Sequence, residues 1–163
     1  MKARMGRWVL AAVLAGASLP AAAVSCTASV PLLSFGNYDV FSASPLLSAT
    51  TLTVTCSKTP SDPNGLVRVD YTITLATGLS MTYAQRKLGG VSDQLGYNLY
   101  TDSARTQIWG NGTGGSIVVT GTLNLTNGNP VLSNQHTVFA SVPALQDVSV
   151  GAYSDAILVA VTY

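Results

Sequence analysis

Residues that could do chemistry are few and scattered in this sequence. There is one histidine, His136, and the acidic residues are seven aspartates, with no glutamate. A serine–histidine–aspartate triad is defined by spatial roles, and serine is so frequent here that pairing one with His136 carries no information. The aspartates stand singly, unlike the paired acids of a glycosidase. We therefore expect no enzymatic activity, no metal site and no cofactor.

One glycine-rich stretch matches the pattern of a dinucleotide site. Residues 110–115 read Gly-Asn-Gly-Thr-Gly-Gly and satisfy G-x-G-x-x-G. In a nucleotide site that motif follows a strand and opens a helix inside a βαβ unit. Here Trp109 precedes it and the strand-forming run 117–119 follows, so we assign the stretch to a loop between strands. Trp109 is either a platform for a sugar ring or an aromatic that pins the loop, and we favour the second.

The first residues carry the pattern of an export signal. Three basic residues precede an apolar stretch from Trp8 to Leu19, and Pro20-Ala21-Ala22-Ala23 follows. This order is typical of a secretory signal peptide, and the apolar stretch is shorter than the roughly 20 residues that span a membrane. We predict cleavage after Ala23, which gives a signal peptide over residues 1–23 and a single domain over residues 24–163.

The predicted mature domain is weakly charged and contains both cysteines. It keeps five basic residues against seven aspartates, a net charge of −2. It therefore lacks the clustered cations that bind phosphate backbones, and we expect no nucleic-acid partner. Cys26 and Cys56 enter an oxidising compartment without Cys-x-x-Cys spacing, which predicts one disulfide. No later apolar stretch is long enough to embed the domain in a membrane.

Short runs of strand-forming residues alternate with turn residues along the mature domain. In Thr50–Cys56, the residues Leu52, Val54 and Cys56 alternate with threonines, which indicates a strand with one buried face. Pro31 argues that the first strand lies at a sheet edge. The links are short, which favours antiparallel pairing, and the pattern predicts an all-β, immunoglobulin-like sandwich. The expected strands cover residues 27–33, 50–56, 67–76, 95–101, 116–125, 136–142 and 154–163.

Several segments resemble the spore coat protein U domain family. Cys26 and the F-G-x-Y pattern in Leu33–Asp39 are similar to its opening. The longest similarity is in Leu95–Thr113, which resembles the family's YNLYTD…R…WG-GT signature over nearly twenty positions. Residues 142–148 and 151–155 resemble its ending, so the similarity covers residues 26–163.

This resemblance implies an incomplete immunoglobulin-like sandwich that lacks its final strand. Proteins with this domain are subunits of archaic chaperone–usher (Csu-type) pili. A periplasmic chaperone lends the missing strand, and the next subunit replaces it during export through the outer-membrane usher. The resemblance therefore implies a disulfide-bonded, structural or adhesive subunit that reaches the cell surface and acts in adhesion and biofilm formation.

The apolar closing run 154–163 is then expected to border the vacant strand position. Strand alternation puts four of its residues on one face, which we take as core-facing. The first strand is expected to supply the opposite wall. The groove residues predicted in this way are Ala28, Val30, Leu32, Ile157, Val159, Val161 and Tyr163.

Two further expectations concern the place of the protein in a fibre. Predicted cleavage leaves Val24 and Ser25 ahead of Cys26, whereas donating a strand takes roughly ten residues of alternating character. We therefore expect a tip or minor subunit. Its candidate surface-contact residues are Trp109, Asn111, Thr113 and Leu145. The alternatives are a secreted coat or matrix protein with the same domain, and a carbohydrate-binding module that uses Trp109.

Overall fold

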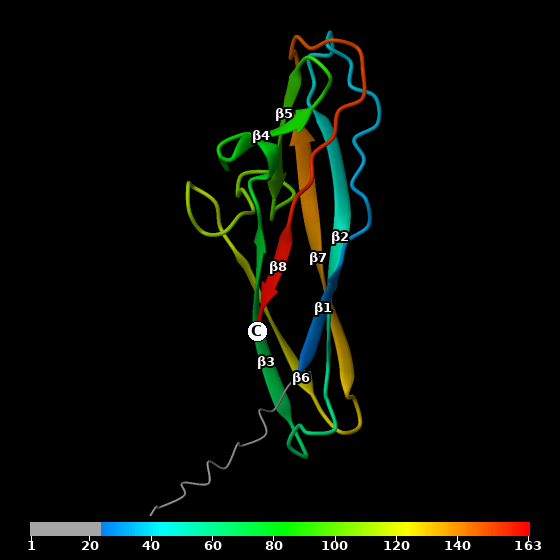
Figure 1. Cartoon of the computed structure of the whole chain (residues 1–163), viewed down its shortest axis with the longest axis vertical. Helices are drawn as coiled ribbons and strands as arrows, with labels where there is room; N and C mark the ends of the chain where they lie inside the picture. The colour runs from blue at the N-terminus through cyan, green and yellow to red at the C-terminus, as the bar shows by residue number, and fades with distance from the viewer. Residues whose placement is uncertain (1–23) are drawn as a thin grey trace, which may run out of the picture.

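The computed structural model describes residues 24–163, so the predicted signal peptide lies outside the described residues. Strands make up the regular structure, together with one short 3-10 turn, η1 (Gly78–Ser80). Figure 1 shows them as an elongated sandwich. The strands are β1 (Ser25–Ser29), β2 (Leu46–Ser57), β3 (Val67–Leu75), β4 (Arg86–Gly89), β5 (Gln94–Tyr100), β6 (Val119–Leu125), β7 (Val131–Val142) and β8 (Val159–Thr162).

The strands form two facing sheets. One sheet has the order β1-β2-β7-β5-β4 and the other the order β6-β3-β8. All strand pairs within them are antiparallel. The longest pair joins β2 to β7 over the whole of both strands, from Leu46 opposite Val142 to Ser57 opposite Val131. The prediction of an all-β, antiparallel sandwich is confirmed.

Several strand bounds depart from the sequence prediction: β2 begins at Leu46 instead of residue 50, β6 at Val119 instead of residue 116, and β7 at Val131 instead of residue 136. The first strand ends at Ser29, before Pro31, because proline cannot donate a ladder hydrogen bond and restrains the residue ahead of it. The last strand begins only at Val159. Strand β4 was not predicted, because its sequence Arg-Lys-Leu-Gly has no alternation of apolar and polar residues.

The core lies between the sheets and follows the predicted alternation. Leu52, Val54 and Cys56 of β2 are fully buried, and Tyr71 and Ile73 of β3 face them from the other sheet. The predicted disulfide is present: Cys26 and Cys56 occupy paired positions on β1 and β2. A bridge across 30 residues contributes about 3–4 kcal/mol on the loop-entropy model. It fastens an edge strand to the centre of the larger sheet.

A buried arginine holds one end of the sandwich together. Arg86 is fully buried, and its guanidinium donates to the carbonyls of Ala76 (3.0 and 2.9 Å) and Trp109 (2.8 Å) and to Asn98 Oδ1 (2.7 Å). Burial lowers the pKa of Arg86. Because Ala76 follows β3 and Asn98 lies on β5, this one side chain links both sheets.

His136 forms a second polar link between the sheets. Its Nε2 lies 2.9 Å from the hydroxyl of Tyr71, and the rings of Tyr71 and Trp109 meet the imidazole edge to face. Gly121 faces Tyr71 in the strand register, and a Cβ there would collide with the tyrosine ring. No carboxylate contacts the imidazole among the described residues, and burial lowers the pKa of His136.

Replacing Arg86 with Met should destabilise the fold by about 3 kcal/mol, since three buried oxygen acceptors lose their donors. Lys87→Met, on the neighbouring residue, is the matched control and should change the free energy of unfolding by less than about 1 kcal/mol. Denaturant unfolding measures both. Equal effects of the two substitutions would contradict the structural role of Arg86.

The protein should lose stability as the pH falls below about 6.5, the ordinary pKa of histidine. The unfolded chain takes up a proton on His136 there, but the folded chain resists it because its pKa is lowered. Stability is therefore complete above this pH and declines towards the folded pKa. Melting temperatures between pH 7.5 and 5 should show this decline, and His136→Gln should flatten it. An unchanged slope in the variant would contradict the idea.

Candidate functional site

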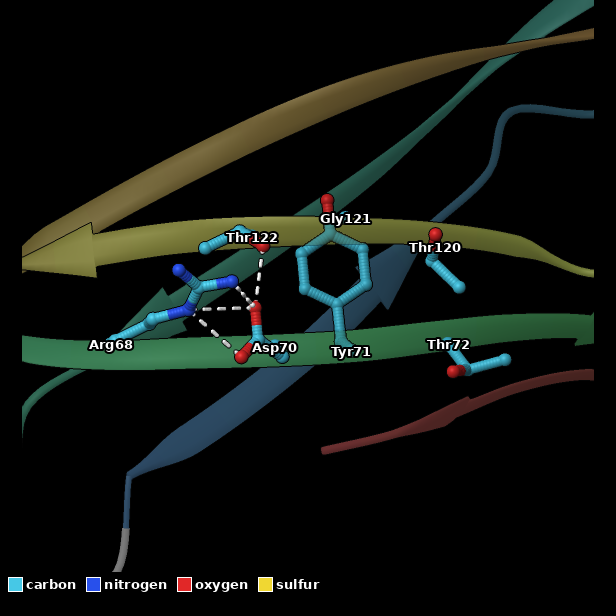
Figure 2. Close-up of a pocket in the computed structure, with 7 residues that line it drawn as sticks. All are labelled: Arg68, Asp70, Tyr71, Thr72, Thr120, Gly121 and Thr122. Carbon is cyan, nitrogen blue, oxygen red and sulfur yellow. Dashed lines mark hydrogen bonds and ion pairs between the residues drawn. The ribbon is translucent and has the colours of Figure 1, made fainter.

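The outer face of the smaller sheet carries a shallow polar hollow, shown in Figure 2. Arg68 donates to both carboxylate oxygens of Asp70 at 2.8–3.0 Å, and Thr122 donates to the same carboxylate. The guanidinium of Arg68 lowers the pKa of Asp70. The two charges neutralise each other and are more than half exposed, so this pair offers no group for acid–base chemistry and stabilises little.

A second and larger hollow is a groove between the two sheets, with a volume of about 1080 Å³. Its floor is aliphatic and comes from both sheets: Leu52 of β2, Leu75 of β3, Leu99 of β5 and Val138 of β7. These floor residues are at most 6% exposed. The groove therefore reaches the hydrophobic core itself.

One side of the groove is residues 30–41, which we call the first wall. No strand forms here, and Leu32 and Phe41 are 93% and 89% exposed. Phe35 packs edge to face on Tyr97 at 5.9 Å. In the described chain, the backbone of residues 30–38 makes no hydrogen bond to another backbone group. The carbonyls of residues 31 and 34 and the amide of residue 36 bond to side chains, and the remaining amides and carbonyls of this stretch are open to a further strand.

The other side is residues 148–157, the second wall, which leads from β7 into β8. Its fixed point is Asp155, whose carboxylate accepts hydrogen bonds from the amide of Leu79 (3.0 Å) and the hydroxyl of Tyr97 (2.7 Å). Burial and the hydrogen bond to Asp155 raise the pKa of Tyr97, so the phenol stays protonated. Ser154 exchanges two backbone hydrogen bonds with Gly89 of β4.

The remaining backbone of the second wall resembles that of the first. From residue 148 to residue 153, the described structure contains no hydrogen bond between backbone groups. Figure 1 shows the two walls running beside one another towards the pole where β2 begins and β7 ends. The arrangement is a slot with a hydrophobic floor, and on both sides most of the backbone has no partner in another backbone segment.

The structure brings together four of the seven predicted groove residues: Val30, Leu32, Ile157 and Val159. Ile157, Val159 and Val161 pack against the core, as alternation predicted. The other three predicted residues do not line the groove. The groove lies beside the first half of β2, whereas β1 pairs with the second half. Ala28 is exposed on β1, Val161 packs against the core outside the groove, and Tyr163 is 55% exposed.

Sequence reasoning missed the aromatic residues of both walls and most of the floor. Phe35 and Tyr38 on the first wall and Tyr153 on the second line the groove. The first two belong to the F-G-x-Y pattern, which was noted only as a similarity. Their spacing, with Leu33 also packed against the core, is the signal that could have identified them.

Trp109 is not a surface residue, and its inclusion among the surface-contact residues was wrong. It is 1% exposed, and its indole nitrogen donates to the carbonyl of Ile73 at 3.2 Å. A sugar ring therefore cannot stack on it, whereas the interpretation as an aromatic that pins a loop agrees with this burial. Asn111, Thr113 and Leu145 are exposed, and residues 110–115 form a loop as predicted.

Two searches of the described residues concern other kinds of site. They contain no group of three or more His, Cys, Asp or Glu side chains placed to hold a metal ion. Within the same residues, no helix has the length and apolar character needed to cross a membrane.

Comparison with solved structures finds similarity to a chain of the CsuC–CsuE complex, a chaperone–tip adhesion subunit pre-assembly complex from archaic chaperone–usher Csu pili of Acinetobacter baumannii. The TM-score is 0.51 at 18% sequence identity, over 86% of this chain and 40% of that chain. The protein thus spans less than half of that chain's length, and the similarity supports the fold.

A search of curated protein sequences finds no match. Among family models, the one described as the Spore Coat Protein U domain matches residues 11–160. That range includes both walls and every strand up to β8. The chain belongs to the Spore Coat Protein U domain family.

Proposed function

We propose that this protein is a structural, non-enzymatic subunit of a chaperone–usher pilus and accepts a β-strand from another polypeptide. The observation that carries the proposal is the groove, in which two walls with few backbone–backbone hydrogen bonds flank an opening into the hydrophobic core. Membership of the Spore Coat Protein U domain family supports it.

Strand addition fits the chemistry of this groove. An added strand gains affinity from main-chain hydrogen bonds and specificity from alternate side chains that enter pockets. The walls offer the hydrogen bonds, and the aliphatic floor offers the pockets. The volume slightly exceeds the usual 300–1,000 Å³ range of small-molecule sites, and the slot is open along its length. An uncovered slot of this kind promotes aggregation, so it needs an occupant at every stage.

The proposed occupants follow in order along an export route. A periplasmic chaperone fills the groove first, and a neighbouring subunit replaces it at the outer-membrane usher, so that the protein reaches the cell surface. The similar solved structure is itself a chaperone–subunit pre-assembly complex, which supports this order. The role we propose on the surface is adhesion and biofilm formation.

Within the fibre, we propose a tip or minor position, on the basis of the predicted cleavage after Ala23. Surface contact would then fall on exposed loops, with Asn111, Thr113 and Leu145 as candidates. Leu145 supports the idea because it is 64% exposed and has a φ of 57°, a left-handed conformation that leucine rarely adopts. Such strain is commonest at functional positions.

The competing function is a coat or matrix protein with the same domain and no usher, which the family's name suggests. Neighbouring genes for a chaperone and an usher distinguish the two. Their absence would favour the coat protein.

Periplasmic co-expression with the organism's pilus chaperone tests strand acceptance. Without chaperone, the protein should be degraded or aggregate, and with it a one-to-one complex should be recovered. Val159→Asp places a charge in the groove and should reduce that complex at least tenfold. Ala160→Asp is its matched control, because Ala160 is exposed on the opposite face of β8. Recovery of the same amount of soluble protein without chaperone as with it would contradict the proposal.

Mass spectrometry of the N-terminus of the exported protein tests the fibre position. We expect the mature chain to begin at Val24, which leaves too few residues before Cys26 to complement another subunit. Cleavage far enough upstream to leave about ten residues would make the protein a donor as well and would rule out the tip assignment.

A further inference from the structure

We propose that Tyr38 fastens the two sides of the groove at one end and thereby sets how many residues of a donated strand can enter. This inference rests on the proposed function and adds to it the length and register of the accepted segment.

The fastening runs through a single phenolic oxygen. The hydroxyl of Tyr38, on the first wall, donates to the carbonyl of Pro143 and accepts from the amide of Gln146, both at 2.8 Å. Pro143 and Gln146 belong to the segment that leads from β7 into the second wall. In the described chain, these are the only hydrogen bonds between residues 30–41 and residues 143–157.

The partner side of this bridge is anchored in the larger sheet. The side-chain amide of Gln146 accepts from the amide of Gly96 at 2.7 Å and donates to its carbonyl at 2.9 Å. Gln146 thus satisfies the edge of β5 as a neighbouring strand would. A Cβ on Gly96 would lie 2.8 Å from Gln146 Oε1 and closer still to Gln85 Nε2, so a larger residue there would displace both glutamine side chains. Tyr38 is therefore tied to a fixed point.

The position of the bridge makes it an end of the groove. It lies at the pole where Leu46 and Val142 face each other as the first and last residues of β2 and β7, and both line the groove. The floor continues along β2 to Leu52. Six residue steps at about 3.3 Å each give a floor roughly 20 Å long. At the other end β1 and β8 approach each other.

A donated strand confined between these two ends covers about seven residues. Alternation then directs three or four of its side chains towards the floor. Residues beyond the seventh would meet Tyr38 and its partners and stay outside. Phenylalanine at position 38 keeps the ring but cannot form either hydrogen bond, so the first wall can move away from Pro143 and admit a longer strand.

The experiment uses self-complemented fusions of the mature chain. Alternating Val-Thr segments of 5, 7, 9 and 11 residues follow Tyr163 through a Gly/Ser linker, and melting temperatures are measured for each. In the wild-type sequence the melting temperature should rise up to the seven-residue segment and then stay level. In Tyr38→Phe it should rise by a further 3–6 °C or so with the longer segments. Tyr100→Phe is the control, since Tyr100 lies outside the groove lining and should keep the wild-type limit.

The possible outcomes distinguish failure of the Tyr38 length limit from failure of strand acceptance. Tyr38→Phe could instead lower the melting temperature of every fusion equally, with no further rise beyond the seven-residue segment. Tyr38 would then be merely structural, and the inference would be overturned. If the melting temperature does not rise with segment length at any length tested, strand acceptance itself fails. Gln146→Met provides a second test should Tyr38→Phe not fold, because it removes the hydrogen bonds to Gly96 and should also shift the limit to longer segments.

Discussion

The structure depends on one constraint: backbone amides and carbonyls need hydrogen-bond partners, and here two long segments beside an open core have no partner in another backbone segment. Residues 30–38 and 148–153 make no hydrogen bonds between backbone groups in the described structure. Backbone groups without hydrogen-bond partners cost free energy when they are buried, and when they are exposed beside aliphatic side chains they tend to pair with other chains. Within the described residues, this groove is therefore the part of the fold best suited to accept a further strand.

Side chains form some of the backbone hydrogen bonds that a further strand would otherwise form. Arg86 saturates carbonyls that follow β3 and precede the glycine-rich loop, and Gln146 imitates a strand neighbour for Gly96. Asp155 and Tyr38 fix the two walls in the same way. Each of these contacts pins a segment at a few points and leaves the rest of its backbone free.

The sequence predicted the architecture better than it predicted the site. The alternation of Leu52, Val54 and Cys56 identified a buried strand face, and the cysteine pair identified the bridge to β1. The groove was harder, because its walls have no strand pattern and its floor consists of ordinary core residues. Trp109 was misplaced since an aromatic beside a glycine-rich loop reads as exposed, whereas tertiary packing buries it. Arg86 was overlooked because a charged residue is seldom buried without an ionic partner.

The pairing of β2 with β7 has a kinetic consequence. Leu46 lies opposite Val142 and Ser57 opposite Val131, so the central ladder can form only after most of the chain has been synthesised. Bringing such distant positions together costs loop-closure entropy before their contacts stabilise the chain, so strands paired in this way form slowly. The newly made polypeptide therefore passes through a stage in which its central strands are apart, and any partner that shortened this stage would protect it from aggregation.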